Sequence, residues 1–268
     1  MSARGGLTLL ICAILLSACG AKRFSPPSGA GLPFAEYASA FAQATGECRN
    51  IKTITATLSL SGRAGDQKLR GQVDAGFSAP SEARLEGSAP FGRPVFILVA
   101  RDATSATLVL PRDNRVLGDA TPASIVEALA GVALAPAELR AAIAGCGFSG
   151  DPADGRLYGD WLAVDTPGAT HYLRRQGGRW RLLVSIRAPL TIEYRDFNAA
   201  GRPSTVRIRT TPAADGAATD MTLRLSDVST NVTLGPEVFA LSIPEGADPL
   251  TLEELRRAGP LGATQPGR

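Results

Sequence analysis

Few side chains in this chain could work together in acid–base, nucleophilic or metal chemistry. His171 is the only histidine among 268 residues, which argues against a histidine-ligated metal, and its place in a predicted strand favours a structural role. Residues 145–150 match GxGxxG by letter but follow a predicted helix, whereas a dinucleotide-binding loop follows a strand. Ser17 and Ser149 lack the G-x-S-x-G surroundings of a hydrolase nucleophile. We therefore expect no enzyme activity, no catalytic residue, no metal site and no cofactor.

The N-terminus carries a more specific chemical signal. Arg4 precedes an apolar stretch, residues 7–18, which is too short to span a hydrocarbon core of about 30 Å and fits an export signal. The stretch ends in LSACG (16–20), which resembles the bacterial lipobox, so we expect Cys19 to be lipidated and to become the mature N-terminus. Gly20 in place of an aspartate favours lipid anchoring in the outer membrane, facing the periplasm. An ordinary export signal that happens to contain a cysteine is the alternative.

Two further cysteines, Cys48 and Cys146, remain in the expected mature chain. The periplasm is oxidising, so an even pair favours a disulfide, which would close a loop of about 100 residues and stabilise the fold by about 4 kcal/mol. Two separate buried thiols are the alternative. No CxxC spacing is present, so neither redox nor zinc chemistry is indicated.

Composition narrows the class of protein. The 28 basic and 25 acidic residues give a formal net charge of +3, which argues against a nucleic-acid partner. Hydrophobic residues make up 44% of the chain, which is enough to fill a core. Four arginines, Arg174, Arg175, Arg179 and Arg181, surround the turn at Gly177. They form either a basic tip for an anionic lipid or an acidic partner, or simply a polar hairpin end.

The elements that must position these residues are mostly strands. Residues 52–61 place apolar side chains on one side and Thr or Ser on the other, which is typical of a half-buried strand. Further strands are predicted at 68–77, 82–87, 94–100, 104–110, 156–164, 169–176, 179–187, 190–197, 203–210 and 219–228, and two short ones at 115–117 and 238–243. Helices are predicted at 33–47, after Thr121 and after Pro136. About eleven antiparallel strands with an N-terminal helix and one helical insertion make a mainly β (α+β), barrel-like single domain.

Several short motifs follow one another in an informative order. They are SAPFG (88–92), ALAGV (128–132), LAP (134–136), LRAAIAG (139–145), GDW (159–161) and Phe239 with Pro244. The segment from Gly87 to Cys146 resembles the LolB branch of the LolA/LolB lipoprotein-carrier superfamily. The chain departs from that pattern because Phe91 replaces a leucine, Ile143-Ala144 lacks the lid tryptophan, and Cys146 and a longer C-terminal part are extra.

This resemblance implies a half-open antiparallel β-barrel whose helical lid encloses an apolar cavity for acyl chains. Its partners would be membrane lipid through acylated Cys19, the acyl chains of lipoproteins or other amphiphiles, and a periplasmic LolA-like carrier. The protein is expected to act as a monomer. Phe91 would insert into the membrane, or else fold back over the barrel end. Inward-facing cavity candidates are Leu58, Leu60, Phe77, Phe96, Leu98, Leu108 and Leu110, of which some should line a cavity and others fill the barrel.

The expected organisation has four parts. Residues 1–18 are a lipoprotein signal peptide, 19–32 a lipidated flexible tether, 33–250 the half-barrel domain, and 251–268 a short helix with a loose tail. The expected function is to receive lipoproteins and help insert them at the outer membrane. The alternatives are a carrier of another amphiphile, such as a glycolipid or phospholipid, and an envelope interaction module without a cavity.

Overall fold

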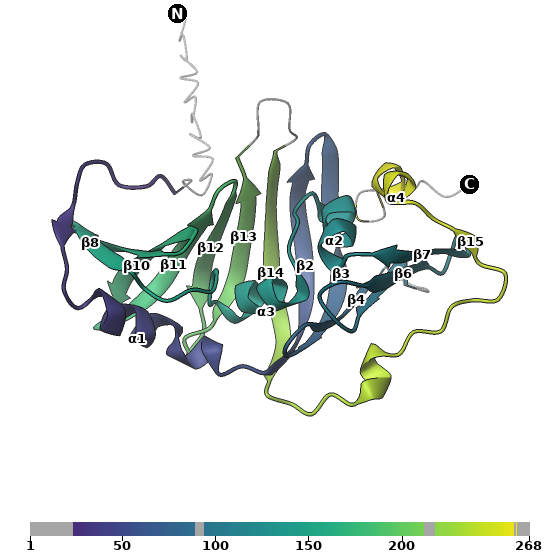
Figure 1. The fold of residues 1–268 in the computed structure, drawn as a ribbon, viewed down its shortest axis with the longest axis horizontal. Coiled ribbons are helices and arrows are strands. Elements are labelled where there is room, and N and C mark those ends of the chain that lie inside the picture. Colours follow the sequence, from purple (N-terminus) through teal and green to yellow (C-terminus); the bar gives the residue numbers. More distant parts are fainter. Residues whose placement is uncertain (1–23, 89–93, 212–217, 260, 262–268) are drawn as a thin grey trace, which may run out of the picture.

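One curved sheet dominates the computed structural model, which describes residues 24–88, 94–211, 218–259 and 261 (Figure 1). Within these residues the sheet has fifteen strands in the order β1-β8-β9-β10-β11-β12-β13-β14-β2-β3-β4-β5-β6-β7-β15, and it does not close. Neighbouring strands are antiparallel except β7 and β15, which are parallel. In chain order the strands are β1 (Leu32–Pro33), β2 (Thr53–Ala64), β3 (Gln67–Ser78), β4 (Glu82–Ser88), β5 (Phe96–Ala100), β6 (Ala106–Leu110), β7 (Arg115–Ala120), β8 (Asp154–Tyr158), β9 (Trp161–Thr166), β10 (Ala169–Gln176), β11 (Arg179–Arg187), β12 (Leu190–Phe197), β13 (Pro203–Thr210), β14 (Thr219–Thr230) and β15 (Asp248–Pro249).

The mainly β, open architecture agrees with the prediction, but the number of strands is fifteen rather than about eleven. The predicted strand 156–164 is two strands, because Gly159 adopts a φ of +59° and turns the chain between β8 and β9. The predicted strand 238–243 is absent, and a 3₁₀ turn, η1 (Pro236–Phe239), occupies its start. Both β1 and β15 have only two residues, which is too few for an alternation of apolar and polar residues to predict them.

Alternation along the long central strands sets the position of the core. In β2, Ile54, Ala56, Leu58 and Leu60 are buried, whereas the Thr and Ser residues between them are half-buried or exposed. β2 pairs along its length with both β3 and β14, so its apolar side chains lie at the middle of the sheet. One face of the sheet therefore carries a continuous apolar surface that other elements must cover.

Three helices cover that face: α1 (Tyr37–Arg49), α2 (Pro122–Ala130) and α3 (Pro136–Ala144) (Figure 1). α2 begins as predicted at Thr121, whose hydroxyl accepts the Ser124 N–H at 3.2 Å. It ends at Gly131 with a φ of +73°, where a Cβ would lie 2.5 Å from the Thr219 Oγ1. α1 begins later than predicted, because Pro33 is paired with Arg156 in the sheet.

The C-terminal segment returns to the helices after circling one sheet edge (Figure 1). The short helix predicted in 251–268 is α4 (Leu252–Ala258), which begins at a capping box in which the Thr251 hydroxyl accepts the Glu254 N–H at 3.2 Å. Leu255 is fully buried, and α4 packs against α2. Among the described residues, none of these helices is long and apolar enough to cross a membrane.

Candidate functional site

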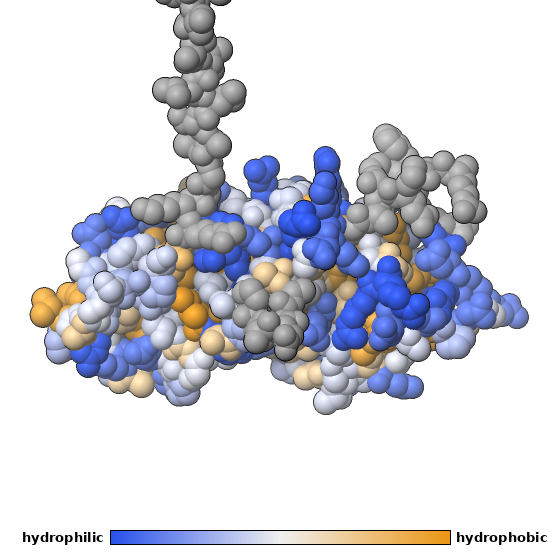
Figure 2. Space-filling model, turned by 90° about the horizontal axis from the view of Figure 1, so that it is seen from above, coloured by the Kyte–Doolittle hydropathy of each residue, from blue (hydrophilic) through white to orange (hydrophobic). Residues whose placement is uncertain are grey.

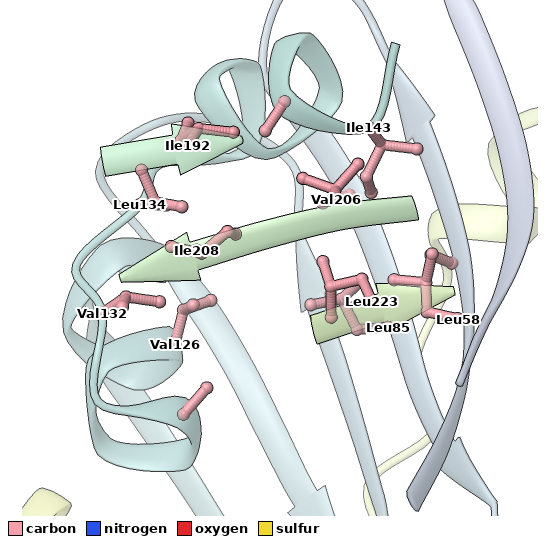
Figure 3. Close-up of a cluster of buried hydrophobic side chains, with 14 of the residues drawn as sticks. Leu58, Leu85, Val126, Val132, Leu134, Ile143, Ile192, Val206, Ile208 and Leu223 are labelled. Atoms are coloured by element: carbon pink, nitrogen blue, oxygen red, sulfur yellow. The ribbon is translucent and has the colours of Figure 1, made fainter. Parts of the chain in front are cut away.

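The segment 122–144, which comprises α2, α3 and their link, forms a lid over the apolar face of the sheet (Figure 3). Four lid side chains point toward six sheet side chains, and each of them is at most 8% exposed. The lid residues are Val126, Val132, Leu134 and Ile143, and the sheet residues are Leu58, Leu85, Ile192, Val206, Ile208 and Leu223. The sheet residues come from β2, β4, β12, β13 and β14, so the lid covers the middle of the half-barrel.

The predicted cavity residues all lie in this apolar interior. Leu58, Leu60, Phe77, Phe96, Leu98, Leu108 and Leu110 are 0–8% exposed and belong to one hydrophobic cluster. Two clefts lined by described residues, of about 390 Å³ and about 270 Å³, lie elsewhere on the molecule. In this closed conformation the seven candidates therefore pack against their neighbours, and lining a cavity would require the lid to move.

The lid is fixed unevenly along its length. At the end of α3, Cys146 forms a disulfide with Cys48 at the end of α1, with the Cα atoms 5.6 Å apart. Glu138 at the start of α3 forms an ion pair with Arg187 of β11. At the link, the hydroxyl of Thr219 donates to the carbonyl of Gly131 at 2.9 Å. Apart from this bond, the link is held mainly by burial of apolar side chains, which is reversible if another apolar surface replaces the lid.

A buried polar cluster anchors the chain just after the lid. The Gly147 N–H donates to the Tyr194 hydroxyl at 2.9 Å, and the Phe148 N–H donates to the Ser185 Oγ at 3.2 Å. Ser185 Oγ lies 2.9 Å from Nδ1 of His171, whose ring is fully buried. These contacts support a structural role for His171. The sequence gives no local sign of them, because their partners come from different strands.

Burial also sets the charge of this histidine. Desolvation, helped by the positive charge of Arg49, lowers the pKa of His171 to about 4. Its Nε2 lies 3.1 Å from the Thr166 hydroxyl, and its ring centroid lies 4.9 Å from that of Phe41. The neutral ring is therefore part of the packing between α1 and the sheet.

The four arginines of the β10–β11 hairpin do not form one free basic tip. Arg174 pairs with Asp160 at 2.7 Å, and the Arg175 guanidinium lies 4.8 Å from the ring centroid of Trp180. Arg179 lies 3.4 Å from a Glu47 carboxylate oxygen. Nη1 of Arg181 donates to the carbonyl of Gly201 at 3.0 Å.

Part of the predicted tether contacts the opposite face of the sheet. The ring of Phe24 lies 5.1 Å from that of Trp161 and 4.9 Å from that of Tyr172. Two further predicted site residues, the lipidation site Cys19 and the membrane-inserting Phe91, lie outside the described residues.

The outer surface contrasts with this interior. Seen from above, most of the surface is hydrophilic, and hydrophobic residues show in a few strips and in a patch at the left end (Figure 2). Among the described residues, the large hydrophobic side chains that are exposed are Leu32, Val232 and Ile243. The apolar surface of the molecule is therefore concentrated beneath the helices.

Comparison with known proteins supports the fold. No family model matches the chain, and neither does any curated protein. A LolA superfamily protein from Nitrosomonas europaea has a similar structure, with a TM-score of 0.50 and 10% identity over 75% of this chain and 94% of that one. A DUF1329 family protein from Desulfovibrio piger has a TM-score of 0.48 and 8% identity over 75% and 96% of the two chains. The lipoprotein LppX from Mycobacterium tuberculosis has a TM-score of 0.33 and 8% identity over 75% and 99%.

At 10% identity, the similarity to the Nitrosomonas europaea structure shows the fold of this chain but not its function. The chain is an open, mainly β half-barrel of the kind seen in the LolA superfamily, with helices over its apolar face. This structural similarity concerns the fold alone and does not show the predicted resemblance to the LolB branch.

Proposed function

We propose that this protein binds acyl chains non-covalently between its sheet and the lid, and that it helps receive and insert lipoproteins at the outer membrane. The observation that carries the proposal is the apolar interior, which is closed by a lid segment held at its link mainly by apolar contacts. An acyl chain could replace the lid side chains against the sheet. Each buried CH₂ contributes about 0.8 kcal/mol, so no covalent chemistry is needed.

Delivery of the cargo to the membrane would need an anchor, a donor protein and a driving force for release. Cys19 would anchor the chain to the outer membrane, and a periplasmic LolA-like carrier would supply the cargo. Release would be driven by the bilayer, which offers acyl chains a larger apolar environment than the half-barrel.

Phe91 is proposed to enter the bilayer during this transfer, because it is an apolar residue flanked by Pro90 and Pro94 in the sequence. A Phe91→Glu variant should bind acyl chains normally but lose delivery of lipoproteins, since a carboxylate at this position opposes entry into hydrocarbon. A transfer assay from carrier to outer-membrane vesicles measures delivery, and Phe91→Leu serves as the matched control. Normal delivery by Phe91→Glu would remove this role.

One alternative function is favoured by a specific observation. Since the interior is filled by the protein's own side chains, the half-barrel could serve as an envelope interaction module that carries nothing. The two functions differ in whether the lid responds to an acylated ligand.

Hydrogen–deuterium exchange with a synthetic diacylated lipopeptide tests this difference. The proposal expects saturable binding and altered exchange in residues 122–144, with little change in β8–β10 on the α1 side. The same peptide without acyl chains is the control. Absence of binding, or identical exchange with and without acyl chains, would favour the interaction module.

A further inference from the structure

A cleft of about 390 Å³ lies beside the covered interior, where α1 and α3 end. Its walls are the last turn of α1, Ala144 and Gly145 at the end of α3, the start of β11, and residues 199–203 between β12 and β13. Cys48 of the disulfide is part of the wall, so the cleft sits where the lid is fixed most firmly.

The cleft is positively charged. Arg179, Arg181 and Arg202 line it, against one carboxylate, that of Glu47. Glu47 and Arg179 are 69% and 61% exposed at a separation of 3.4 Å, so water screens their attraction. Even if this pair is counted as neutral, two guanidinium groups remain without an acidic residue among the cleft walls.

Both of these guanidinium groups retain donors for an anion. Arg202 donates from Nη1 to the Thr230 hydroxyl at 2.9 Å, while its Nε is buried and has no hydrogen-bond partner among the described residues. Arg181 uses Nη1 for the carbonyl of Gly201, and its Cζ lies 5.2 Å from the ring centroid of Phe197. A buried donor without an acceptor costs free energy, so an anion that contacted the Arg202 guanidinium would find an unused donor there.

The turn at Gly201 is built around one of these arginines. Gly201 has a φ of +75°, and a Cβ on it would lie 2.8 Å from Nη1 of Arg181. Glycine at this position therefore allows both the left-handed backbone and the close approach of the guanidinium.

Two apolar residues of the interior also form part of the cleft wall. Leu182 and Ala144 line the cleft, yet each is 3% exposed and belongs to the main hydrophobic cluster. Trp180 and Phe197 add aromatic surface to the walls. A charged cleft next to an apolar interior suits an amphiphile whose head group is anionic and whose tail is hydrocarbon.

We infer that this cleft binds the phosphate of a phospholipid whose acyl chains lie beneath the lid, an inference that rests on the proposed function. Guanidinium groups hold phosphate oxygens through paired N–H donors, which an uncharged lipid cannot use. The cleft thus adds a ligand class, anionic phospholipid, to the acylated proteins proposed above.

Tryptophan fluorescence can read this cleft directly. The chain has two tryptophans, so a Trp161→Phe background leaves Trp180 as the single reporter in the cleft wall. The chain from Gly20 onward, which contains every described residue, is titrated with dihexanoyl phosphatidic acid below its micelle concentration. Dihexanoylglycerol and inorganic phosphate are titrated in parallel.

The inference expects phosphatidic acid to bind at least tenfold more tightly than either dihexanoylglycerol or inorganic phosphate. Arg202→Gln and Arg181→Gln should each weaken its binding at least tenfold, and high salt should weaken it too. Arg224→Gln, at an exposed position on β14, is the matched control and should not change it. Circular dichroism checks that each variant is folded, and the two arginine variants are independent of one another.

The other possible results distinguish failure of the phosphate site from failure of acyl-chain binding. Equal affinity for phosphatidic acid and dihexanoylglycerol overturns the phosphate site but leaves acyl binding intact. Inorganic phosphate binding as tightly as phosphatidic acid would show a site for free phosphate and overturn the lipid assignment. If neither lipid binds, the proposed function fails as well.

Discussion

At the residue scale, burial controls the charge of His171. The unfolded chain protonates this ring with the ordinary pKa of 6.5, whereas the folded chain does so at about 4. The unfolded state therefore binds more protons between these values, and stability present above pH 6.5 is lost as the pH falls toward 4. The full loss attributable to this group is about 3 kcal/mol.

Urea unfolding of His171→Gln measures this contribution. The variant should be less stable than the wild type at pH 7.5, because its hydrogen bonds with Ser185 and Thr166 are imperfect, but its stability should fall less between pH 6.5 and pH 4. An unchanged difference between the two proteins over this range would contradict the low pKa. Arg224→Gln, on an exposed surface, controls for general charge effects.

Residue types alone predicted the disulfide beside the lid but not the hydrogen bonds of the arginines in the cleft. An even pair of cysteines in a chain expected to be exported indicated the disulfide that joins Cys48 to Cys146. The partners of Arg181 and Arg202 could not be predicted, because Gly201 and Thr230 reach them only through the folding of the β12–β13 turn and of β14.

At the element scale, the disulfide fixes one end of the lid. It spans 98 residues, so its loss should destabilise the fold by about 4 kcal/mol in the chain-entropy model. The double variant Cys48→Ser, Cys146→Ser should match the reduced wild type in thermal unfolding. Equal stability of the oxidised and reduced proteins would contradict a stabilising role.

The lid also makes a kinetic prediction. Leu134 in the link is fully buried against the sheet, and Leu134→Ala should cost about 2–5 kcal/mol and speed acyl-chain uptake, because the closed lid loses contacts. Leu162→Ala, equally buried but in β9 on the α1 side, should cost a similar free energy without speeding uptake. Stopped-flow binding of a fluorescent fatty acid distinguishes them, and equal rates would contradict opening at the lid.

Some helices and strands are easier to predict from their sequences than others. Alternation in β2 and the proline and glycine at the ends of α2 and α3 predict these elements correctly. The hairpin at Gly159 was missed although Gly159-Asp160 is a two-residue turn signal between apolar runs, whereas β1 and β15 are defined only by their partners in the sheet. Local pattern therefore predicts elements with their own period and fails for elements that depend on tertiary pairing.

At the scale of the whole molecule, the expected tether contacts the body of the protein. Phe24, which lies five positions after Cys19 in the sequence, packs against Trp161 and Tyr172. Five residues span about 17 Å when extended, against about 40 Å for the full tether. If Cys19 carries lipid, as proposed, this short spacing would hold the half-barrel close to the bilayer, where the proposed release of cargo would take place.

The sequence also could not predict whether the interior is open or filled. That depends on the summed volume of side chains from distant elements, such as Leu58 of β2, Ile208 of β13 and Ile143 of α3. The inward-facing positions could be predicted from alternation, but their mutual packing is a property of the assembled sheet and lid.

Native mass spectrometry of the chain from Gly20 onward, purified gently from lipid-containing membranes, shows whether this protein carries acyl chains. We expect an adduct that disappears on delipidation and whose mass matches an acylated species, either a lipoprotein or a phospholipid. A chain that carries no adduct, and that also takes up no added diacylated peptide, would contradict acyl binding and leave the half-barrel as a filled interaction module.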